Sequence, residues 1–94
     1  GGEINASLLQ DPSEKALFER YLQVKKEVEK NIEEKAYERA LMEMMKLKGP
    51  IDDLFDSVLI MDGVEEKREN RLALLGNIGA LFLRIGDFST LVTE

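Results

Sequence analysis

The side chains that could carry chemistry in this chain of 94 residues are carboxylates, ammoniums, guanidiniums and amides. Histidine and cysteine are both absent, which removes the usual general base, the commonest metal ligand and any thiolate nucleophile. Catalysis would have to rest on carboxylates alone, and no pattern in the sequence pairs an acid with a base in one cleft. The chemistry that remains is recognition, in which lysines and arginines bind phosphates while amides and guanidiniums contact base edges.

The net charge of −6 would by itself argue against a nucleic-acid partner. The distribution of the charges along the chain therefore has to be considered. Six acids and no base lie between Ile51 and Glu66, and the rest of the chain carries 13 acids and 13 bases. The acidity is therefore one local patch, and the global charge is a poor guide to partners. The patch lacks the loop spacing and the central glycine of a calcium-binding loop, so we expect no metal and no cofactor in this chain. Its members are Asp52, Asp53, Asp56, Asp62, Glu65 and Glu66.

Composition predicts one all-helical domain over residues 1–94. Hydrophobic residues make up 44% and charged residues 34%, which is typical of a globular domain, and the stretches between the two prolines and the glycines are rich in helix formers. No apolar run approaches the roughly 18 residues needed to span a membrane. The first residues lack an initiator methionine and a signal pattern, so we expect a fragment of a longer cytoplasmic chain, with residues 1–10 as a flexible lead-in.

Four helices are predicted to position these side chains. Asp11, Pro12 and Glu14 form a capping-box pattern that starts the first helix, whose apolar stripe is Leu17, Tyr21, Val24, Val28 and Ile32. A second stripe through Tyr37, Leu41 and Met44 ends at Lys48-Gly49-Pro50, where the glycine is expected to cap the helix and the proline to start the next. The third helix is predicted from Pro50 to about Ile60.

The fourth predicted helix follows the turn at Met61-Asp62-Gly63 and ends at Gly86. Small residues within it are expected to let a neighbouring helix approach closely, and its tail is expected to fold back onto the bundle. Its predicted core stripe is Leu72, Leu75, Gly79, Phe82 and Gly86, flanked by Ile78, Leu83 and Ile85, and the small residues are Gly76, Gly79 and Ala80.

Short connections favour an antiparallel four-helix, up-and-down bundle. In that arrangement the ends of the second and fourth helices share one pole, which gathers Lys46, Lys48 and Arg84. The end of the first helix meets the start of the fourth at the other pole, which gathers Lys30, Lys35, Lys67, Arg68 and Arg71.

Three stretches of the second half resemble the C-terminal anticodon-binding domain, of the DALR kind, of bacterial glycyl-tRNA synthetase beta subunits. Pro50–Met61 is similar to the stretch that opens the last two helices in that family. Arg68–Leu75 is similar to its segment of arginine, any residue, asparagine, arginine, leucine, alanine and two leucines, and Leu81–Ser89 resembles its closing segment. The first 45 residues match more loosely.

The resemblance implies a cytoplasmic, anticodon-binding helical module that binds tRNA and is not an enzyme on its own. It implies that the rest of a beta subunit and a separate catalytic alpha subunit are partners, and that ATP is used by the alpha subunit. The RNA-contact candidates that follow are Lys46, Lys48, Lys67, Arg68, Asn70, Arg71 and Arg84.

Two alternatives stay open at this point. Arg68 and Arg71 share the stripe of Leu72 and lie in the opening turns of a helix, where the dipole disfavours cations. They therefore need an anionic partner, which is either an acid such as Asp56 or Asp62 or an RNA phosphate. Arg84 is expected on an outward face with Asn70 and Asn77. The competing function is a helical subunit-docking domain that makes no RNA contact.

Overall fold

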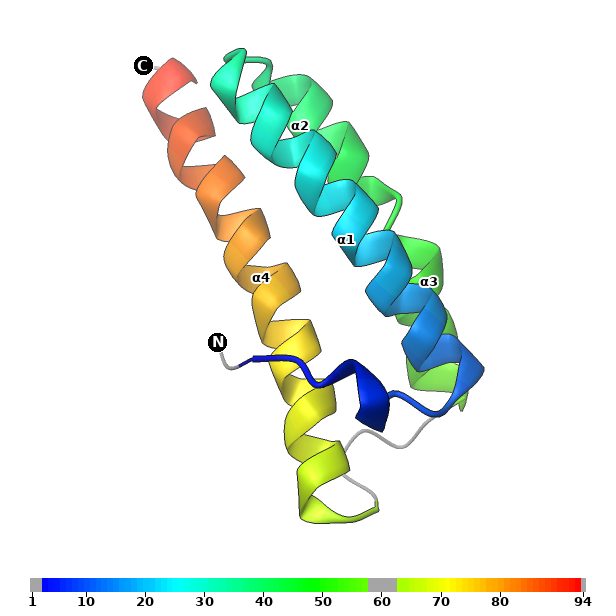
Figure 1. The fold of residues 1–94 in the computed structure, drawn as a ribbon. Coiled ribbons are helices and arrows are strands. Elements are labelled where there is room, and N and C mark those ends of the chain that lie inside the picture. Colours follow the sequence, from blue (N-terminus) through cyan, green and yellow to red (C-terminus); the bar gives the residue numbers. More distant parts are fainter. Residues whose placement is uncertain (1–2, 58–62, 94) are drawn as a thin grey trace.

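The computed structural model describes residues 3–57 and 63–93, with side chains described as far as residue 86. The elements are a short 3₁₀ helix, η1 (Ala6–Leu8), and the α-helices α1 (Pro12–Glu33), α2 (Tyr37–Met45), α3 (Lys48–Ser57) and α4 (Glu65–Thr93). They form an elongated body of 45 × 20 × 20 Å (Figure 1). Strands are absent from the described part of the chain, which confirms the predicted all-helical class.

The predicted capping box starts α1. Asp11 accepts the backbone N–H of Ser13 at 2.9 Å, and Glu14 accepts the N–H of Asp11 at 3.2 Å, while Pro12 occupies the first helical position. The pKa of Asp11 is lowered, first because its carboxylate accepts a hydrogen bond from the Ser13 side chain and next because it accepts the Ser13 N–H. Charged, it complements the partial positive charge of the helix N-terminus.

The end of α1 is a Schellman motif built on a lysine. Lys35 has φ 59°, its N–H donates to the carbonyl of Ile32, and the N–H of Ala36 donates to the carbonyl of Asn31 at 2.7 Å. Glycine or asparagine normally occupies this left-handed position because a Cβ is strained there. The lysine explains why the sequence marks this helix end only weakly.

Helices α2 and α3 form one leg that runs in a single direction, antiparallel to α1 (Figure 1). Only Lys46 and Leu47 separate them, and Lys46 keeps a helical backbone (φ −67°, ψ −14°). The chain therefore bends without reversing, and Gly49 and Pro50 fall inside the first turn of α3. The prediction that Gly49 caps the second helix is wrong, since α2 has already ended at Met45.

Two ion pairs show that α1 and α4 run parallel. Glu14, early in α1, pairs with Arg71, early in α4; Glu29, late in α1, pairs with Arg84, late in α4. The body thus has three legs, α1, α2 with α3, and α4. The all-helical class agrees with the prediction. The chain does not adopt the predicted up-and-down order of four helices, because the connection between α2 and α3 does not reverse the direction of the chain.

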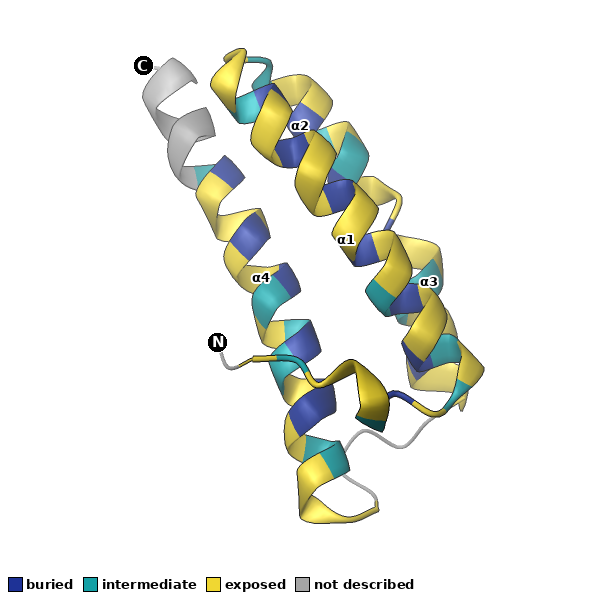
Figure 2. Cartoon of the chain, viewed as in Figure 1, coloured by how far each residue is buried: buried dark blue, intermediate teal, exposed yellow. Residues whose placement is uncertain are grey.

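The core lies where the three legs face each other (Figure 2). The predicted stripe of α1 is confirmed at Leu17, Tyr21, Val24 and Val28, with Asn31 buried at its end in place of the half-buried Ile32. The other legs contribute Ala40, Met44, Leu47, Leu54, Leu74, Ile78, Leu81 and Ile85.

The predicted core stripe of α4 is wrong, although Ile78 and Ile85, which were expected to flank it, are buried and Leu75 is half-buried against the core. The buried positions are Leu74, Ile78, Leu81 and Ile85, whereas Leu72 and Phe82 are 44% and 51% exposed. The buried stripe has the same helical spacing but is rotated about one residue around the helix axis. Within the described part of the chain, a Cβ at Gly76 or Gly79 would meet no atom within 4 Å. The expected close approach of a helix to these glycines is therefore absent there.

The last part of α4 also differs from the expectation. The helix continues through Gly86 to Thr93 instead of stopping at Gly86. Glycine lowers helix propensity by about 1 kcal/mol but does not end a helix whose following residues can continue it. The side chains of Phe88, Leu91 and Val92, expected to fold back, lie outside the described residues, as do Asp62 and the residues between Ser57 and Gly63.

The segment before α1 is attached to α4. Asn70 accepts the backbone N–H of Asn5 at 2.7 Å and donates to its carbonyl at 3.0 Å, and Leu9 is buried. Within the expected flexible lead-in, Asn5 is therefore hydrogen-bonded to α4 and Leu9 is buried.

Candidate nucleic-acid interface

Lys46 and Lys48 lie at the bend between α2 and α3, halfway along that leg. Each has an acid beside it on the same leg: Lys46 Nζ donates to Glu43 at 2.8 Å, and Lys48 Nζ donates to Asp52 at 2.8 Å. The hydrogen bond to the Asp52 carboxylate, and then its negative charge, raise the pKa of Lys48 above its usual value. Both ammonium groups are more than half exposed, so solvent screens these pairs and a phosphate can compete for the lysines.

Lys67 and Arg68 occupy the first turn of α4 and are half-buried. Lys67 Nζ donates to Gln10 Oε1 at 2.9 Å, so this lysine ties the N-terminal segment to the helix. Arg68 lies on the same face of α4 as Leu72 and Leu75 by helical spacing, but it does not become part of the core.

Asn70 and Arg71 have structural roles. Both amide contacts of Asn70 go to Asn5, and Asn70 is buried beneath the N-terminal segment. Arg71 is buried and its Nε donates to Glu14 Oε2 at 3.3 Å. Of the two hypotheses for Arg71, the structure has the internal salt bridge, and Glu14 of α1 is an acid that forms it.

Arg84 is exposed on α4, with its guanidinium 3.6 Å from Glu29. The expected outward face that it shares with Asn70 is not found, because residues 3–10 cover Asn70. Arg84 remains accessible, since its side chain is about half exposed.

The structure does not form the two cation clusters that the up-and-down bundle predicts. Lys30 and Lys35 lie at the end of α1, and Lys67 lies at the start of α4; because the two helices are parallel, these residues are at opposite ends of the body. Lys46 and Lys48 lie at the junction of α2 and α3, and this junction is at mid-length of the body rather than at a pole (Figure 1). The candidates from the sequence therefore lie in three places: at the bend between α2 and α3, at the start of α4 and late in α4.

The seam between α1 and α2 brings Lys30 and Lys46, which the sequence did single out, together with Arg20 and Arg39, which it did not. Two shallow cavities of about 400 and 260 Å³ follow one another along it and share Glu27 and Glu43. Arg20 and Lys46 border the first cavity, and Lys30 and Arg39 border the second. The amides of Gln23 and Asn31 lie along the same seam. Only the antiparallel pairing of α1 with α2 brings these groups together, so no signal in the sequence alone marks them.

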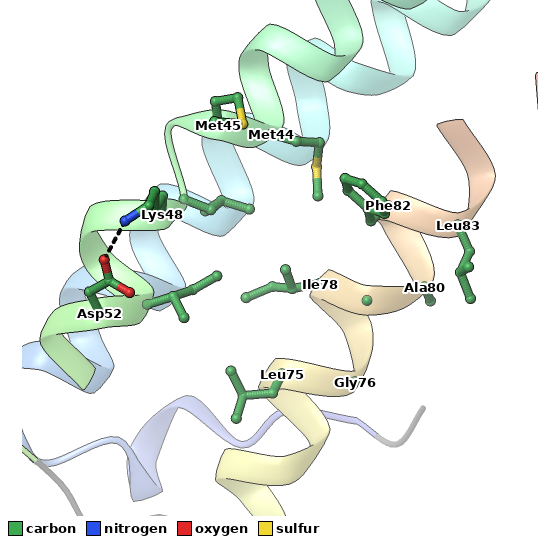
Figure 3. A pocket seen from close by; sticks show the side chains of 13 residues that line it. Met44, Met45, Lys48, Asp52, Leu75, Gly76, Ile78, Ala80, Phe82 and Leu83 are labelled. Atoms are coloured by element: carbon green, nitrogen blue, oxygen red, sulfur yellow. Dashed lines mark hydrogen bonds and ion pairs between the residues drawn. The ribbon is translucent and has the colours of Figure 1, made fainter. Parts of the chain in front are cut away.

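A separate hollow, which we call the apolar groove, lies between the α2–α3 leg and α4. It encloses about 800 Å³. Met44 and Phe82 point toward one another across it, and Leu75 and Ile78 extend from α4 toward α3 (Figure 3). Gly76, Gly79 and Ala80 form part of its α4 wall. The groove is almost without polar groups, with Lys48 and Asp52 at its edge.

Other kinds of site find little support in the described residues. No group of three or more His, Cys, Asp or Glu side chains there is arranged to hold a metal ion. None of the described helices is long and apolar enough to cross a membrane.

The three-legged body, the cationic seam and the apolar groove define a small helical binding module. Residues 2–85 match the family described as the DALR anticodon binding domain, which is a binding domain and not a catalytic one. The chain belongs to this family.

The chain is similar to parts of several proteins named glycine–tRNA ligase beta subunit. It is 41% identical over 90 residues to that of Thermotoga neapolitana, covering 96% of this chain and 13% of the relative. It is 40% identical over 87 residues to that of Persephonella marina, covering 93% and 12%. For Haemophilus influenzae the identity is 38% over 90 residues, covering 96% and 13%. The chain thus spans about an eighth of the length of these relatives.

Proposed function

We propose that the chain is the tRNA anticodon-binding module of a glycine–tRNA ligase beta subunit, in the cytoplasm. The observation that carries this proposal is the family match over residues 2–85, which includes α1, α2 and α3 and most of α4. In the proposed assembly the ligation of glycine, with its use of ATP, takes place on the alpha subunit. In that reaction this chain contributes RNA recognition.

The α1–α2 seam is the surface we propose for the RNA. Arg20, Lys30, Arg39 and Lys46 supply four cations along it, against the acids Glu27, Glu34 and Glu43. Lys48 follows at the bend. Guanidinium and ammonium groups would neutralise phosphates, and the exposed amide of Gln23 offers a donor and an acceptor to unpaired bases. Helix α3, by contrast, exposes Asp52, Asp53 and Asp56, which repel phosphates.

Binding of tRNA to the 94-residue chain tests the function directly. We expect a transcript with a glycine anticodon to bind more tightly than the same transcript with an altered anticodon. Affinity should fall steeply as salt rises, with a logarithmic slope of about −0.7 for each phosphate contact to single-stranded RNA. Equal binding of both transcripts, or none, would refute anticodon reading by this chain. A subunit-docking domain that makes no RNA contact would bind neither transcript.

A matched pair of variants locates the surface. Arg20→Gln and Lys46→Gln remove exposed charges from the seam and should each weaken tRNA binding and reduce the salt slope by about 0.7. Lys67→Gln removes a charge of the same sign from the start of α4 and should change neither. If Lys67→Gln weakens binding as much as the seam variants do, the RNA surface is not the seam.

A further inference from the structure

Apart from Lys48 at its edge, the apolar groove lies outside the surface proposed for RNA. Three of its side chains are strongly exposed although they are large and hydrophobic: Met45 at 66%, Phe82 at 51% and Leu83 at 68%. Contiguous exposed apolar surface of this kind marks a site of contact with another apolar surface. Phosphates and base edges need charges and hydrogen-bond donors, which the groove interior lacks.

The shape of the groove fits a helix. Its two walls are helical legs that run in opposite directions, and its α4 wall extends from Leu75 to Leu83, about 12 Å or two turns. The space above Gly76 and Gly79 is open to at least 4 Å from an added Cβ. Small residues there let another helix backbone come close, and a helix laid between the α2–α3 leg and α4 would become a fourth leg of the bundle.

The acidic side chains beside the groove favour a basic partner. Asp52 borders the groove, Asp56 lies one turn further along the same face of α3, and Asp53 is exposed next to them. Lys48, the lysine at this edge, is already paired with Asp52. The uncompensated charge is negative, and the whole chain carries −6. A second copy of this chain would bring like charges together, whereas a basic partner would complement them.

We infer that the apolar groove binds an amphipathic protein helix whose apolar stripe is flanked by lysines or arginines. The stripe packs against Met44, Met45, Ile78 and Phe82, the helix backbone passes over Gly76 and Gly79, and the basic flank faces Asp52 and Asp56. This inference does not depend on RNA binding, because the seam and the groove lie on different pairs of legs.

The substitution Gly79→Leu tests the inference without damaging the fold. Gly79 is in mid-helix, has no neighbouring atom within 4 Å of an added Cβ and does not have a positive φ, so leucine enters open space and raises helix propensity. It also fills the groove. Gly49→Ala is the matched control: Gly49 is likewise helical and has open space around it, but it is not among the groove residues.

The probe is a displayed library of helical peptides about 15 residues long, selected on the 94-residue chain. We expect enriched peptides to carry apolar residues at helical spacing with lysine or arginine beside them. The best peptide should bind Gly79→Leu about tenfold more weakly than the unchanged chain, and Gly49→Ala equally well. Asp52→Lys combined with Asp56→Lys should also weaken it, and NMR shifts should locate it at Ile78 and Phe82.

Several results would overturn the inference. Enriched peptides that are acidic or lack helical spacing would contradict the proposed partner, and so would no enrichment at all. Peptides that bind Gly79→Leu unchanged would exclude the groove. Concentration-dependent dimerisation of the chain that Gly79→Leu abolishes would assign the groove to a second copy. If tRNA competed with the peptide and the substitution Gly79→Leu abolished this competition, the groove would be assigned to RNA.

Discussion

Glu14→Gln is the most informative single substitution, because Glu14 uses its two carboxylate oxygens for two different contacts. Oε1 accepts the N–H of Asp11 at 3.2 Å, and Oε2 accepts Nε–H of Arg71 at 3.3 Å. The first contact caps α1 and the second joins α1 to α4. Glutamine has one acceptor oxygen, so it can serve the cap or the arginine but not both.

The magnitude follows from the burial of the pair. Glu14 is 3% exposed and Arg71 8%, so the substitution removes the Glu14 carboxylate from a buried guanidinium. Breaking a buried ion pair costs about 3–5 kcal/mol. Since Arg71 has further interactions, we expect about 3 kcal/mol, the lower end of that range. For a domain of this length a loss of that size lowers the Tm by about 12–24 °C.

The assay is urea and thermal unfolding followed by circular dichroism, in a double-mutant cycle. Arg71→Met alone should also destabilise, because it leaves the Glu14 carboxylate buried and without its cation. Glu14→Gln combined with Arg71→Met should cost less than the two single losses added together, with a coupling of about 2 kcal/mol. A loss below about 1 kcal/mol for Glu14→Gln, or a coupling near zero, would refute the reasoning that this pair joins α4 to α1.

Four further outcomes are expected. Gly79→Ala should stabilise by about 0.5–1 kcal/mol in urea unfolding, because the methyl enters open space on a helix; a loss would mean that the backbone there is strained. Lys35→Gly should stabilise by about 1 kcal/mol, since Lys35 holds φ 59°, and unchanged stability in the same assay would contradict that geometry. Asn70→Ala should cost about 2 kcal/mol for two hydrogen bonds and speed hydrogen exchange at Asn5, and protection at Asn5 that persists would count against the anchor. The lowered pKa of Asp11 gives stability that is present at neutral pH and lost as the pH falls through that lowered value, so the Tm advantage over Asp11→Asn should shrink in acid; a constant difference would exclude the titration of Asp11.

The start of α1 could be predicted to the residue. A capping box depends on the residue types at Asp11 and Glu14 and on the spacing between them, and both are local properties of the chain. The stripe of Leu17, Tyr21, Val24 and Val28 could be predicted for the same reason, because α1 has charged residues on its remaining faces.

The core face of α4 could not be predicted in this way. Leucine, isoleucine and phenylalanine lie on most faces of this helix. The sequence therefore contains two apolar stripes with the same spacing that could face the core, one through Leu74 and Ile78 and one through Leu75 and Phe82. The pairing of Arg71 with Glu14 and the cover of Asn70 by Asn5 fix which of the two faces inward. Both contacts join residues 57 or more positions apart, and short-range patterns carry no information about them.

By itself the sequence determined the all-helical class, the first helix, and the resemblance to an anticodon-binding domain, since these depend on residue types and short spacings. The tertiary structure alone decided how the legs run, because Lys46 keeps a helical backbone at the bend where a reversal was expected. That bend separates the predicted cation clusters and places Lys46 beside Arg20 on the α1–α2 seam. It also leaves α4 facing the α2–α3 leg across an open apolar groove.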